Sequence, residues 1–253
     1  MRLLALLLAA AVIAPASLAQ GRLTVAAAIS LTDVLEALAP MHAARGGARV
    51  RFNFGPSNAL ARQIAHGAPV DLFISADEHQ MALAAAAGAI DETTRVDLLG
   101  NHLAVVTNRE RAAAIPDARA LAGGAVRRIA IGDPAAVPVG IYARQYLQKL
   151  GMWDVLQPKL VPVRNARAAV AAVEHGSVDA AVVYESDAVA AALQVAFVVT
   201  GADAPAIRYP AAVLKASRRR DDAARFLRFL CSAEAAAVFR QHKFVPLGCG
   251  VRP

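Results

Sequence analysis

Residues 23–40, LTVAAAISLTDVLEALAP, contain two hydrophobic patterns that meet at Ser30. Before Ser30 the run is continuously apolar, which is typical of a strand buried on both faces. After it, apolar residues recur at the spacing of one helical face: Leu31, Val34, Leu35 and Leu38. The stretch therefore predicts a strand followed at once by a helix, and Pro40 is expected to end or kink that helix.

The same alternation continues along the chain and predicts an α/β fold. Further strands are expected at 49–54, 70–75, 102–108, 127–133, 178–184 and 207–217. Helices are expected at 58–67, 77–88, 138–151, 166–176 and 186–193, and two more in 220–244, divided near Ser232. In the first third of the chain this β-α order predicts a mostly parallel sheet with helices on both faces, and a second such sheet is expected where the pattern restarts near residue 100.

An internal repeat indicates two lobes of similar construction. QIAHGAPVDLFISADE (63–78) and AVEHGSVDAAVVYESDA (172–188) each read as a helix ending in His-Gly, then Val-Asp and an apolar strand. We expect residues 20–100 plus 204–253 to form the first lobe and 101–203 the second. The chain would then cross between the lobes twice, near 99–102 and 200–209, and two crossing segments make a hinge.

The N-terminus has the pattern of a secretory signal peptide. Arg2 precedes an apolar run that is too short to span a bilayer, and small residues follow at Ser17 and Ala19. Residues 1–19 are therefore expected to be removed after Ala19, which predicts export to a bacterial periplasm.

Composition argues against several classes of function. The chain has 27 Lys and Arg against 20 Asp and Glu, but the basic residues are scattered and not interleaved with aromatic ones. Nucleic acid is therefore not an expected partner. The six His and two Cys have no metal-ligand spacing. An oxidising compartment permits a disulfide between Cys231 and Cys249, but the sequence leaves open whether they pair.

The junctions between strands and helices are the candidate binding positions. In a parallel sheet, such junctions face the crevice where ligands bind, and helix N-termini there offer free N–H groups to an anion. Ser30, in a capping-box-like Ser-x-x-Asp, is expected to cap its helix as well. Similar junctions lie near Ser57, Val139 and Ala166, and one strand ends at Tyr184.

Several longer stretches resemble the periplasmic molybdate-binding protein of ABC-type importers. They are AAAISLTDVLEALA (26–39), LARQIAHGAPVDLFISADE (60–78), IDETTRVDLLGNHLAVV (90–106), GDPAAVPVGIYARQYLQKLGMWDVLQPKL (132–160) and VVYESDAVA (182–190). The resemblance implies a two-lobed periplasmic binding protein fold, with molybdate or tungstate held between the lobes. It also implies a membrane permease as partner, a monomeric protein, no cofactor and no enzymatic activity.

The resemblance assigns five contacts to the oxyanion. They are the hydroxyls of Ser30, Ser57 and Tyr184 and the backbone N–H groups of Val139 and Ala166. The stretch around Ser57, GPSNAL, is poorer in serine than is usual for that family. Such neutral donors would hold a dianion without burying a cation, and they would disfavour a protonated anion.

Two other functions stay open from the residues alone. The protein could bind another oxyanion such as sulfate. A periplasmic dehydratase-like enzyme on the same fold would need a general acid or base in the cleft, and the candidates are Asp33, Asp133, Glu185 and Asp187.

Overall fold

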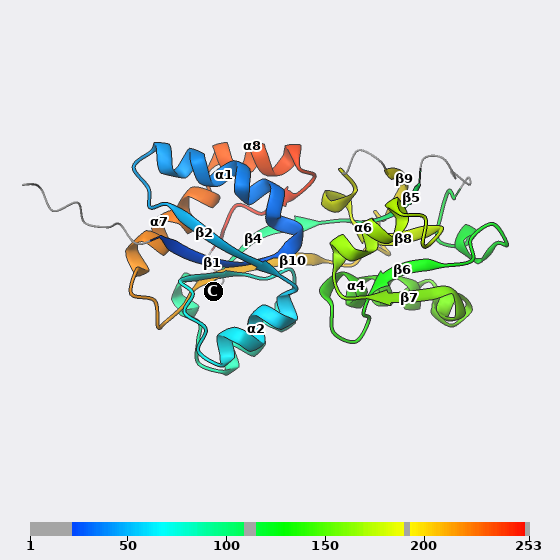
Figure 1. Cartoon of the computed structure of the whole chain (residues 1–253), viewed down its shortest axis with the longest axis horizontal. Coiled ribbons are helices and arrows are strands. Elements are labelled where there is room, and N and C mark those ends of the chain that lie inside the picture. The colour runs from blue at the N-terminus through cyan, green and yellow to red at the C-terminus, as the bar shows by residue number, and fades with distance from the viewer. Residues whose placement is uncertain (1–21, 109–114, 190–192, 251–253) are drawn as a thin grey trace, which may run out of the picture.

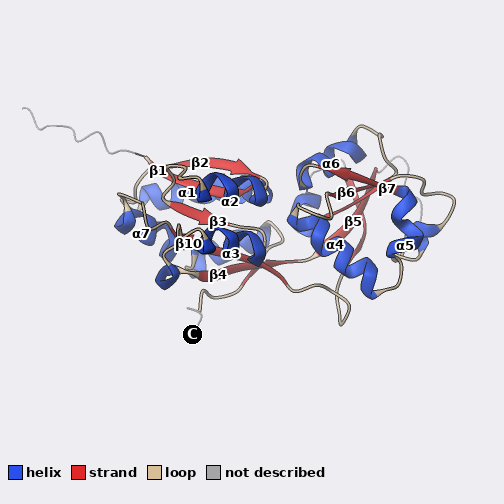
Figure 2. Ribbon diagram, turned by 90° about the horizontal axis from the view of Figure 1, so that it is seen from below, coloured by secondary structure: helices blue, strands red, loops and turns tan. Residues whose placement is uncertain are grey.

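The computed structural model describes residues 22–108, 115–189 and 193–250, which form two sheets flanked by helices (Figure 1). The predicted signal peptide, 1–19, lies outside the described residues. The first sheet has the order β11-β4-β10-β3-β1-β2 and the second β7-β6-β8-β5-β9. Figure 2 shows the two sheets in separate halves of the molecule.

The first sheet draws its strands from both ends of the chain. These are β1 (Leu23–Ala28), β2 (Val50–Gly55), β3 (Leu72–Ile74), β4 (Val96–Asn101), β10 (Ile207–Val213) and β11 (Val245–Pro246). Helices α1 (Thr32–Ala44), α7 (Arg220–Leu230) and α8 (Ala233–Gln241) lie on one face, and α2 (Ser57–Ala65) and α3 (Glu78–Ala86) on the other (Figure 1). Successive residues of β1 point to opposite faces of the sheet. Val25 packs in the core beneath α1 and α7, and Ala26 packs in the core beneath α2 and α3.

The second sheet is built from the middle of the chain. Its strands are β5 (Leu103–Asn108), β6 (Ile129–Gly132), β7 (Leu160–Val163), β8 (Ala180–Tyr184) and β9 (Leu193–Val198). Helices α4 (Pro138–Lys149) and α5 (Trp153–Leu156) belong to one core, and α6 (Ala166–Glu174) to the other. Two 3-10 turns adjoin strand ends and matter below: η1 (Ile29–Leu31) and η6 (Glu185–Val189).

Both sheets are mixed rather than mostly parallel. In the first, β1 pairs in parallel with β2 and β3, whereas β10 runs antiparallel to β3 and β4. In the second, β5 runs antiparallel to β8 and β9. The strands next to the passages between the sheets, β4, β5, β9 and β10, all have antiparallel partners, because the chain leaves the first sheet along β4 and returns to it along the neighbouring strand β10.

The chain passes between the sheets over two connections. Only His102 separates β4 from β5, and residues 199–206 lead back from β9 to β10. Strands β4 and β10 are paired next to each other, with Leu99 opposite Tyr209. The two connections therefore start from adjacent strands of the first sheet.

One helix prediction was wrong in part and another was wrong. Pro40 does not end helix α1, which continues to Ala44, and a kink at Pro40 stays a prediction. Pro40 is exposed, and so is Glu36, whose carbonyl loses its helical donor there and can bond to water. The helix expected at 186–193 is instead the turn η6, and Leu193 begins β9, an edge strand paired with β5. Residues 190–192 lie outside the described residues.

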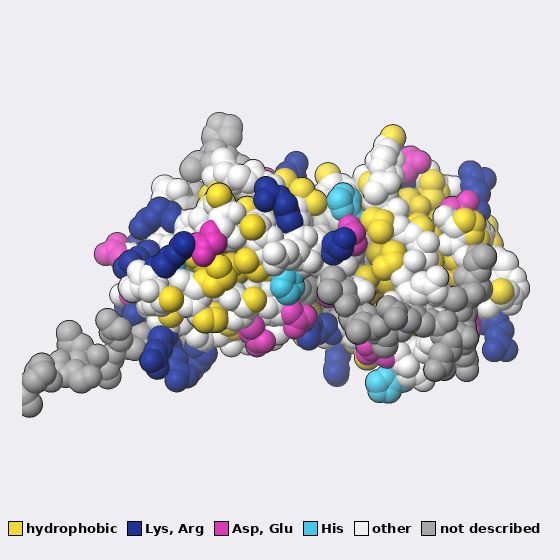
Figure 3. All heavy atoms as spheres, turned by 90° about the horizontal axis from the view of Figure 1, so that it is seen from above, with side chains coloured by type: hydrophobic (Ala, Val, Ile, Leu, Met, Phe, Trp, Pro, Cys, Tyr) yellow, Lys and Arg dark blue, Asp and Glu magenta, His cyan; other side chains and the backbone are white. Residues whose placement is uncertain are grey.

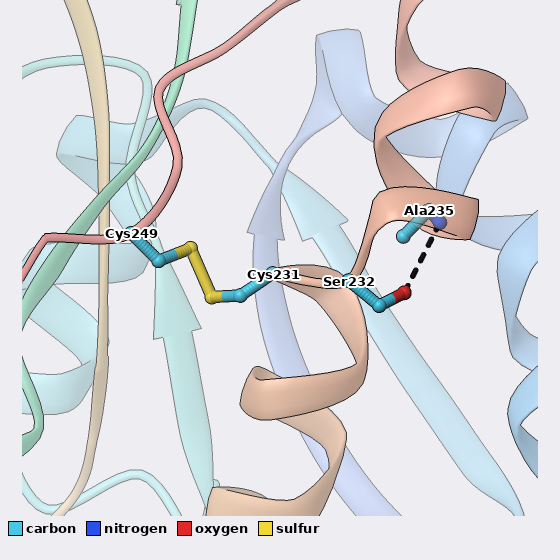
Figure 4. The surroundings of a disulfide bond; sticks show 4 residues. All are labelled: Cys231, Ser232, Ala235 and Cys249. Carbon is cyan, nitrogen blue, oxygen red and sulfur yellow. Dashed lines mark hydrogen bonds between the residues drawn. A yellow bond between two sulfur atoms is a disulfide. The ribbon is translucent and has the colours of Figure 1, made fainter.

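A disulfide joins Cys231 to Cys249, with their Cα atoms 5.7 Å apart (Figure 4). Cys231 directly follows α7, and the next residue, Ser232, caps α8 by accepting a hydrogen bond from the Ala235 N–H. The bridge closes a loop with a sequence separation of 18 residues. In the chain-entropy model a loop of this size stabilises the fold by about 3 kcal/mol. The loop includes β11, so the bridge holds this short edge strand against β4.

Candidate anion-binding site

All five residues that the sequence assigns to the ligand line one small cavity. They are Ser30, Ser57, Val139, Ala166 and Tyr184. The remaining lining residues are Ala28, Ile29, Gly55, Pro56, Ala76, Val137, Pro138 and Asn165. The cavity volume that the centre of a water molecule can occupy is about 20 Å³. A single bound water needs roughly 10–15 Å³ of such volume, so the cavity suits a small ion rather than a sugar or a peptide.

Three helices begin at this cavity. Ser57 is the first residue of α2, Val139 the second of α4, and Ala166 the first of α6. The first turn of a helix leaves its N–H groups without intrahelical acceptors and carries a partial positive charge. The cavity therefore collects hydrogen-bond donors from the two halves of the molecule: α2 lies against the first sheet, and α4 and α6 against the second.

Asn165 leaves the first N–H groups of α6 free for a ligand. Its side-chain oxygen caps the helix by accepting from the Ala168 N–H at 2.8 Å, and its carbonyl accepts from the Ala169 N–H. The N–H groups of Ala166 and Arg167 precede those of Ala168 and Ala169 in the first helical turn. Neither therefore donates to the cap at Asn165.

Close packing fixes the start of α4. Gly132 ends β6, and a Cβ built on Gly140 would lie 1.9 Å from the carbonyl oxygen of Gly132. Only a glycine at position 140 lets the helix approach the strand this closely. Because Gly140 is next to Val139, this contact sets the position of the Val139 N–H in the cavity.

Ser30 lies in the cavity, but it does not cap α1. It sits inside η1, the N-cap of α1 is Leu31, and neither helix has a side-chain cap bond. Instead Ser30 Oγ lies 3.1 Å from Tyr209 Oη, where either atom can be the donor. The expected cap was wrong because a 3-10 turn comes between β1 and α1, and because the hydroxyl has a partner 179 residues away.

Ser57 presents its proton to the cavity. Its Oγ accepts a hydrogen bond from the Ala76 N–H at 2.9 Å, and the side chain is 2% exposed. The Ala76 N–H can only donate, so the serine oxygen must accept, and the hydroxyl proton is left for another partner.

Tyr184 carries a buried hydroxyl without a partner. The residue ends β8 and is 2% exposed, and its Oη makes no hydrogen bond to any described residue. Buried polar groups are seldom left unpaired, so this oxygen is a candidate contact for a ligand. Burial raises the pKa of Tyr184 well above its ordinary value, so the hydroxyl keeps its proton and can donate.

The lining consists of neutral groups. None of the described residues around the cavity is Asp, Glu, Lys, Arg or His. On the face seen in Figure 3, Lys and Arg side chains are dispersed among acidic ones. Hydroxyls and backbone N–H groups aimed into a buried space can stabilise a dianion by hydrogen bonds alone.

The four acidic residues considered for an enzyme do not line the cavity. Asp33 forms an ion pair with Arg167 at 2.7 Å, and Glu185 lies 3.3 Å from His102 Nδ1. Asp133 accepts from the Ala135 N–H, and Asp187 lies beside a neighbouring cleft. The cavity thus contains no carboxylate that could act on a bound ligand.

Asp187 should make the stability of the protein depend on pH. Its Oδ2 is buried and has no hydrogen-bond partner in the described part of the chain, and burial raises the pKa of Asp187 to about 7, although the charge of Arg167 opposes this. A raised pKa in the folded state means that stability is lost as the pH rises from about 4 through 7. Asp187→Asn should therefore be more stable than the parent at pH 8, by roughly 1–4 kcal/mol, and equal to it near pH 4.

Urea unfolding at several pH values measures this difference. The exposed Asp154→Asn is the charge-matched control. If the difference in unfolding free energy between Asp187→Asn and the parent does not change with pH, the expectation is contradicted.

Asn101 and Tyr209 were missed by the sequence analysis. Tyr209 is fully buried and contacts Ser30, and Asn101 lies behind Tyr209 with its Nδ2 3.3 Å from the phenol oxygen. Residues this far apart in the chain carry no local signal that would connect them with Ser30.

Comparison with known proteins shows the family of the chain. The family model described as bacterial extracellular solute-binding protein matches residues 23–245. The chain is 40% identical to the molybdate-binding protein ModA of Escherichia coli (strain K12), over 89% of each chain. The resemblance to periplasmic molybdate-binding proteins that the sequence motifs indicate is therefore confirmed.

Solved structures agree with the predicted fold. The periplasmic molybdate-binding protein of Azotobacter vinelandii superposes with a TM-score of 0.78 at 26% identity, over 88% of this chain and 99% of that one. The sulfate-binding protein SubI of Mycobacterium tuberculosis superposes with a TM-score of 0.80 over 91% and 88%, but at 21% identity it shows the fold alone. The two-lobed α/β fold is confirmed, and the chain belongs to the family of bacterial extracellular solute-binding proteins.

Proposed function

We propose that this protein captures molybdate outside the cytoplasm, in the periplasm, and delivers it to the permease of an ABC importer. The observation that carries the proposal is the cavity of about 20 Å³ in which hydroxyls and helix N-termini converge without a charged side chain. Tungstate has the same charge and tetrahedral shape, so the same donors would bind it. The protein acts as a monomeric carrier and not as an enzyme.

The ligand would be held by donors from both lobes. Ser30 and Ser57 come from the lobe formed by 20–100 and 204–253, and Val139, Ala166 and Tyr184 from the lobe formed by 101–203. An anion bound to both sets favours the closed arrangement, because the open arrangement would lose half of its contacts. Motion between the lobes would bend the two connections, at His102 and at 199–206.

Selectivity would come from two properties of the cavity. Donors without acceptors disfavour hydrogen phosphate, because its O–H would find no partner. Sulfate is unprotonated but smaller than molybdate, so it would leave some donors at longer distances. Size therefore separates molybdate from sulfate, and hydrogen-bond polarity separates it from phosphate.

Calorimetric titration tests the proposal. The exported chain, starting at residue 20, is titrated with molybdate, tungstate, sulfate and phosphate at pH 8. We expect tight binding of molybdate and tungstate, weak binding of sulfate and weaker binding of phosphate. Equal affinities for molybdate and sulfate would replace the proposal with that of a general oxyanion carrier. A protein that binds none of the four would refute it.

A further inference from the structure

Behind Ser30 lies a chain of buried hydrogen bonds whose other members, Tyr209 and Asn101, do not line the cavity. Asn101 Nδ2 lies 3.3 Å from Tyr209 Oη, and Tyr209 Oη lies 3.1 Å from Ser30 Oγ. Tyr209 is 0% exposed, Asn101 5% and Ser30 8%. Because these groups are buried, each hydrogen has few possible acceptors, so the donor and the acceptor of each hydrogen bond can be identified.

The direction is set by a backbone group at one end. The His102 N–H donates to Asn101 Oδ1 at 2.8 Å. A backbone N–H can only donate, so the atom that it meets must be the amide oxygen, and the other end of the amide must be the NH₂ group. That NH₂ group has two hydrogens and two partners, Ser186 Oγ at 2.8 Å and Tyr209 Oη.

The order of donors then follows along the chain. Tyr209 Oη accepts from Asn101, so its single proton is directed to its other partner, Ser30 Oγ. Burial raises the pKa of Tyr209 well above its ordinary value, which keeps that proton in place. Ser30 Oγ accepts from Tyr209, and its own proton is therefore left for the cavity. Ser57 reaches the same state through the Ala76 N–H.

We propose that Asn101 and Tyr209 are positioning residues that force Ser30 to act as a hydrogen-bond donor toward the bound oxyanion. This hydrogen-bond relay, from Asn101 through Tyr209 to Ser30, rests on the proposed function. The direction in which the Ser30 hydroxyl donates matters for binding only if Ser30 contacts the anion. Without the relay, Ser30 could direct its proton to Tyr209 and present a lone pair to the ligand. A lone pair repels an anion, so the relay excludes the unfavourable polarity before the ligand arrives.

Neutron diffraction from the unliganded, deuterium-exchanged protein tests the direction of the bonds without any ligand. We expect deuterium on Tyr209 Oη to point to Ser30 Oγ, and the deuterium of Ser30 to point into the cavity. A Ser30 deuterium that points to Tyr209 would overturn the proposal. This outcome does not depend on whether the protein binds molybdate.

A double-mutant cycle tests the consequence for binding. Tyr209→Phe keeps the ring, which packs 5.7 Å from Tyr184 and 5.6 Å from Phe244, and removes only the hydroxyl. We expect it to weaken molybdate binding about 3- to 10-fold in the parent, the range for a lost neutral hydrogen bond, and less than about 2-fold in a Ser30→Ala background. A role in packing alone would give the same loss in both backgrounds and would overturn the relay.

The matched control is Tyr142→Phe, which removes a hydroxyl from another buried tyrosine that does not line the cavity. It should leave the affinity unchanged. If Ser30→Ala itself does not weaken binding, Ser30 is not a ligand contact. That result removes Ser30 from the proposed site and refutes the relay's role in binding, while neutron diffraction still reports the polarity.

Reversing the relay gives a second test. The carboxylate introduced by Asn101→Asp accepts but does not donate, so Tyr209 would turn its proton toward it and Ser30 would turn toward Tyr209. Ser186→Asp adds the same charge at the hydrogen-bond partner of Asn101 but leaves the Asn101 amide in place. We expect Asn101→Asp to weaken molybdate binding at least about 10-fold more than Ser186→Asp, since it also removes a hydrogen bond to a charged group. Equal losses would mean that charge alone matters and would overturn the proposal.

Discussion

Gly140→Ala should destabilise the protein by at least about 3 kcal/mol and abolish tight ligand binding, because its added methyl group collides with backbone. The Cβ would lie 1.9 Å from the Gly132 carbonyl oxygen, 2.4 Å from the Gly132 carbonyl carbon and 2.8 Å from the Asp133 carbonyl oxygen. No side chain can rotate away to relieve this contact. Either β6 or the start of α4 must move, and α4 carries the Val139 N–H.

Urea unfolding and molybdate titration of Gly140→Ala measure the two effects. Gly124→Ala is the control, because a Cβ at that position meets no atom within 4 Å. It should leave stability within about 0.5 kcal/mol of the parent, as is usual for surface positions, and leave affinity unchanged. If Gly140→Ala binds molybdate as the parent does, the start of α4 does not position the ligand.

Tyr184→Phe should separate affinity from stability. The hydroxyl is buried and has no hydrogen-bond partner among the described residues, so its removal breaks no hydrogen bond within that part of the protein. With the anion bound, the same hydroxyl would make a hydrogen bond to a charged group, worth about 1.5–3 kcal/mol. We expect molybdate affinity to fall roughly 10- to 150-fold, while the unliganded variant unfolds at the same or a higher urea concentration.

The readouts for Tyr184→Phe are the urea midpoint without ligand and the dissociation constant by calorimetry. Tyr146→Phe, on α4 and away from the cavity, is the matched control and should bind as the parent does. An unchanged affinity in Tyr184→Phe would remove this residue from the site. A large loss of stability without ligand would mean that the hydroxyl has a structural partner after all.

Much of the fold could be predicted because local patterns determine it. The strand β1 and the helices α2, α3, α4 and α6 follow from hydrophobic periodicity, and Asp77 and Gly88 bound α3 as expected. The strands β4, β7, β9 and β11 were not predicted. Strands β7, β9 and β11 lie at sheet edges, β7 and β11 are shorter than β1, and each of the four is defined by pairing with strands distant in sequence.

The site was predictable to a different degree. The resemblance singled out five residues that the structure brings into one cavity. The local Ser-x-x-Asp motif, by contrast, predicted a capping role for Ser30 that the 3-10 turn excludes. The hydrogen-bond partners that orient these residues could not be predicted from the sequence. Tyr209 lies 179 residues from Ser30 and Asn101 lies 85 residues from Ser186, and only the tertiary fold brings them together.

The neutral lining of the cavity has a consequence for the electrophoretic behaviour of the protein. Without residues 1–19, of which Arg2 alone is charged, the formal net charge falls from +7 to +6. Among the described residues, the lining contains no Asp, Glu, Lys, Arg or His that could take up a proton when a dianion binds, so binding lowers the net charge by the full two units. The complex should therefore migrate more slowly toward the cathode than the free protein in a native gel, which makes binding visible without a label.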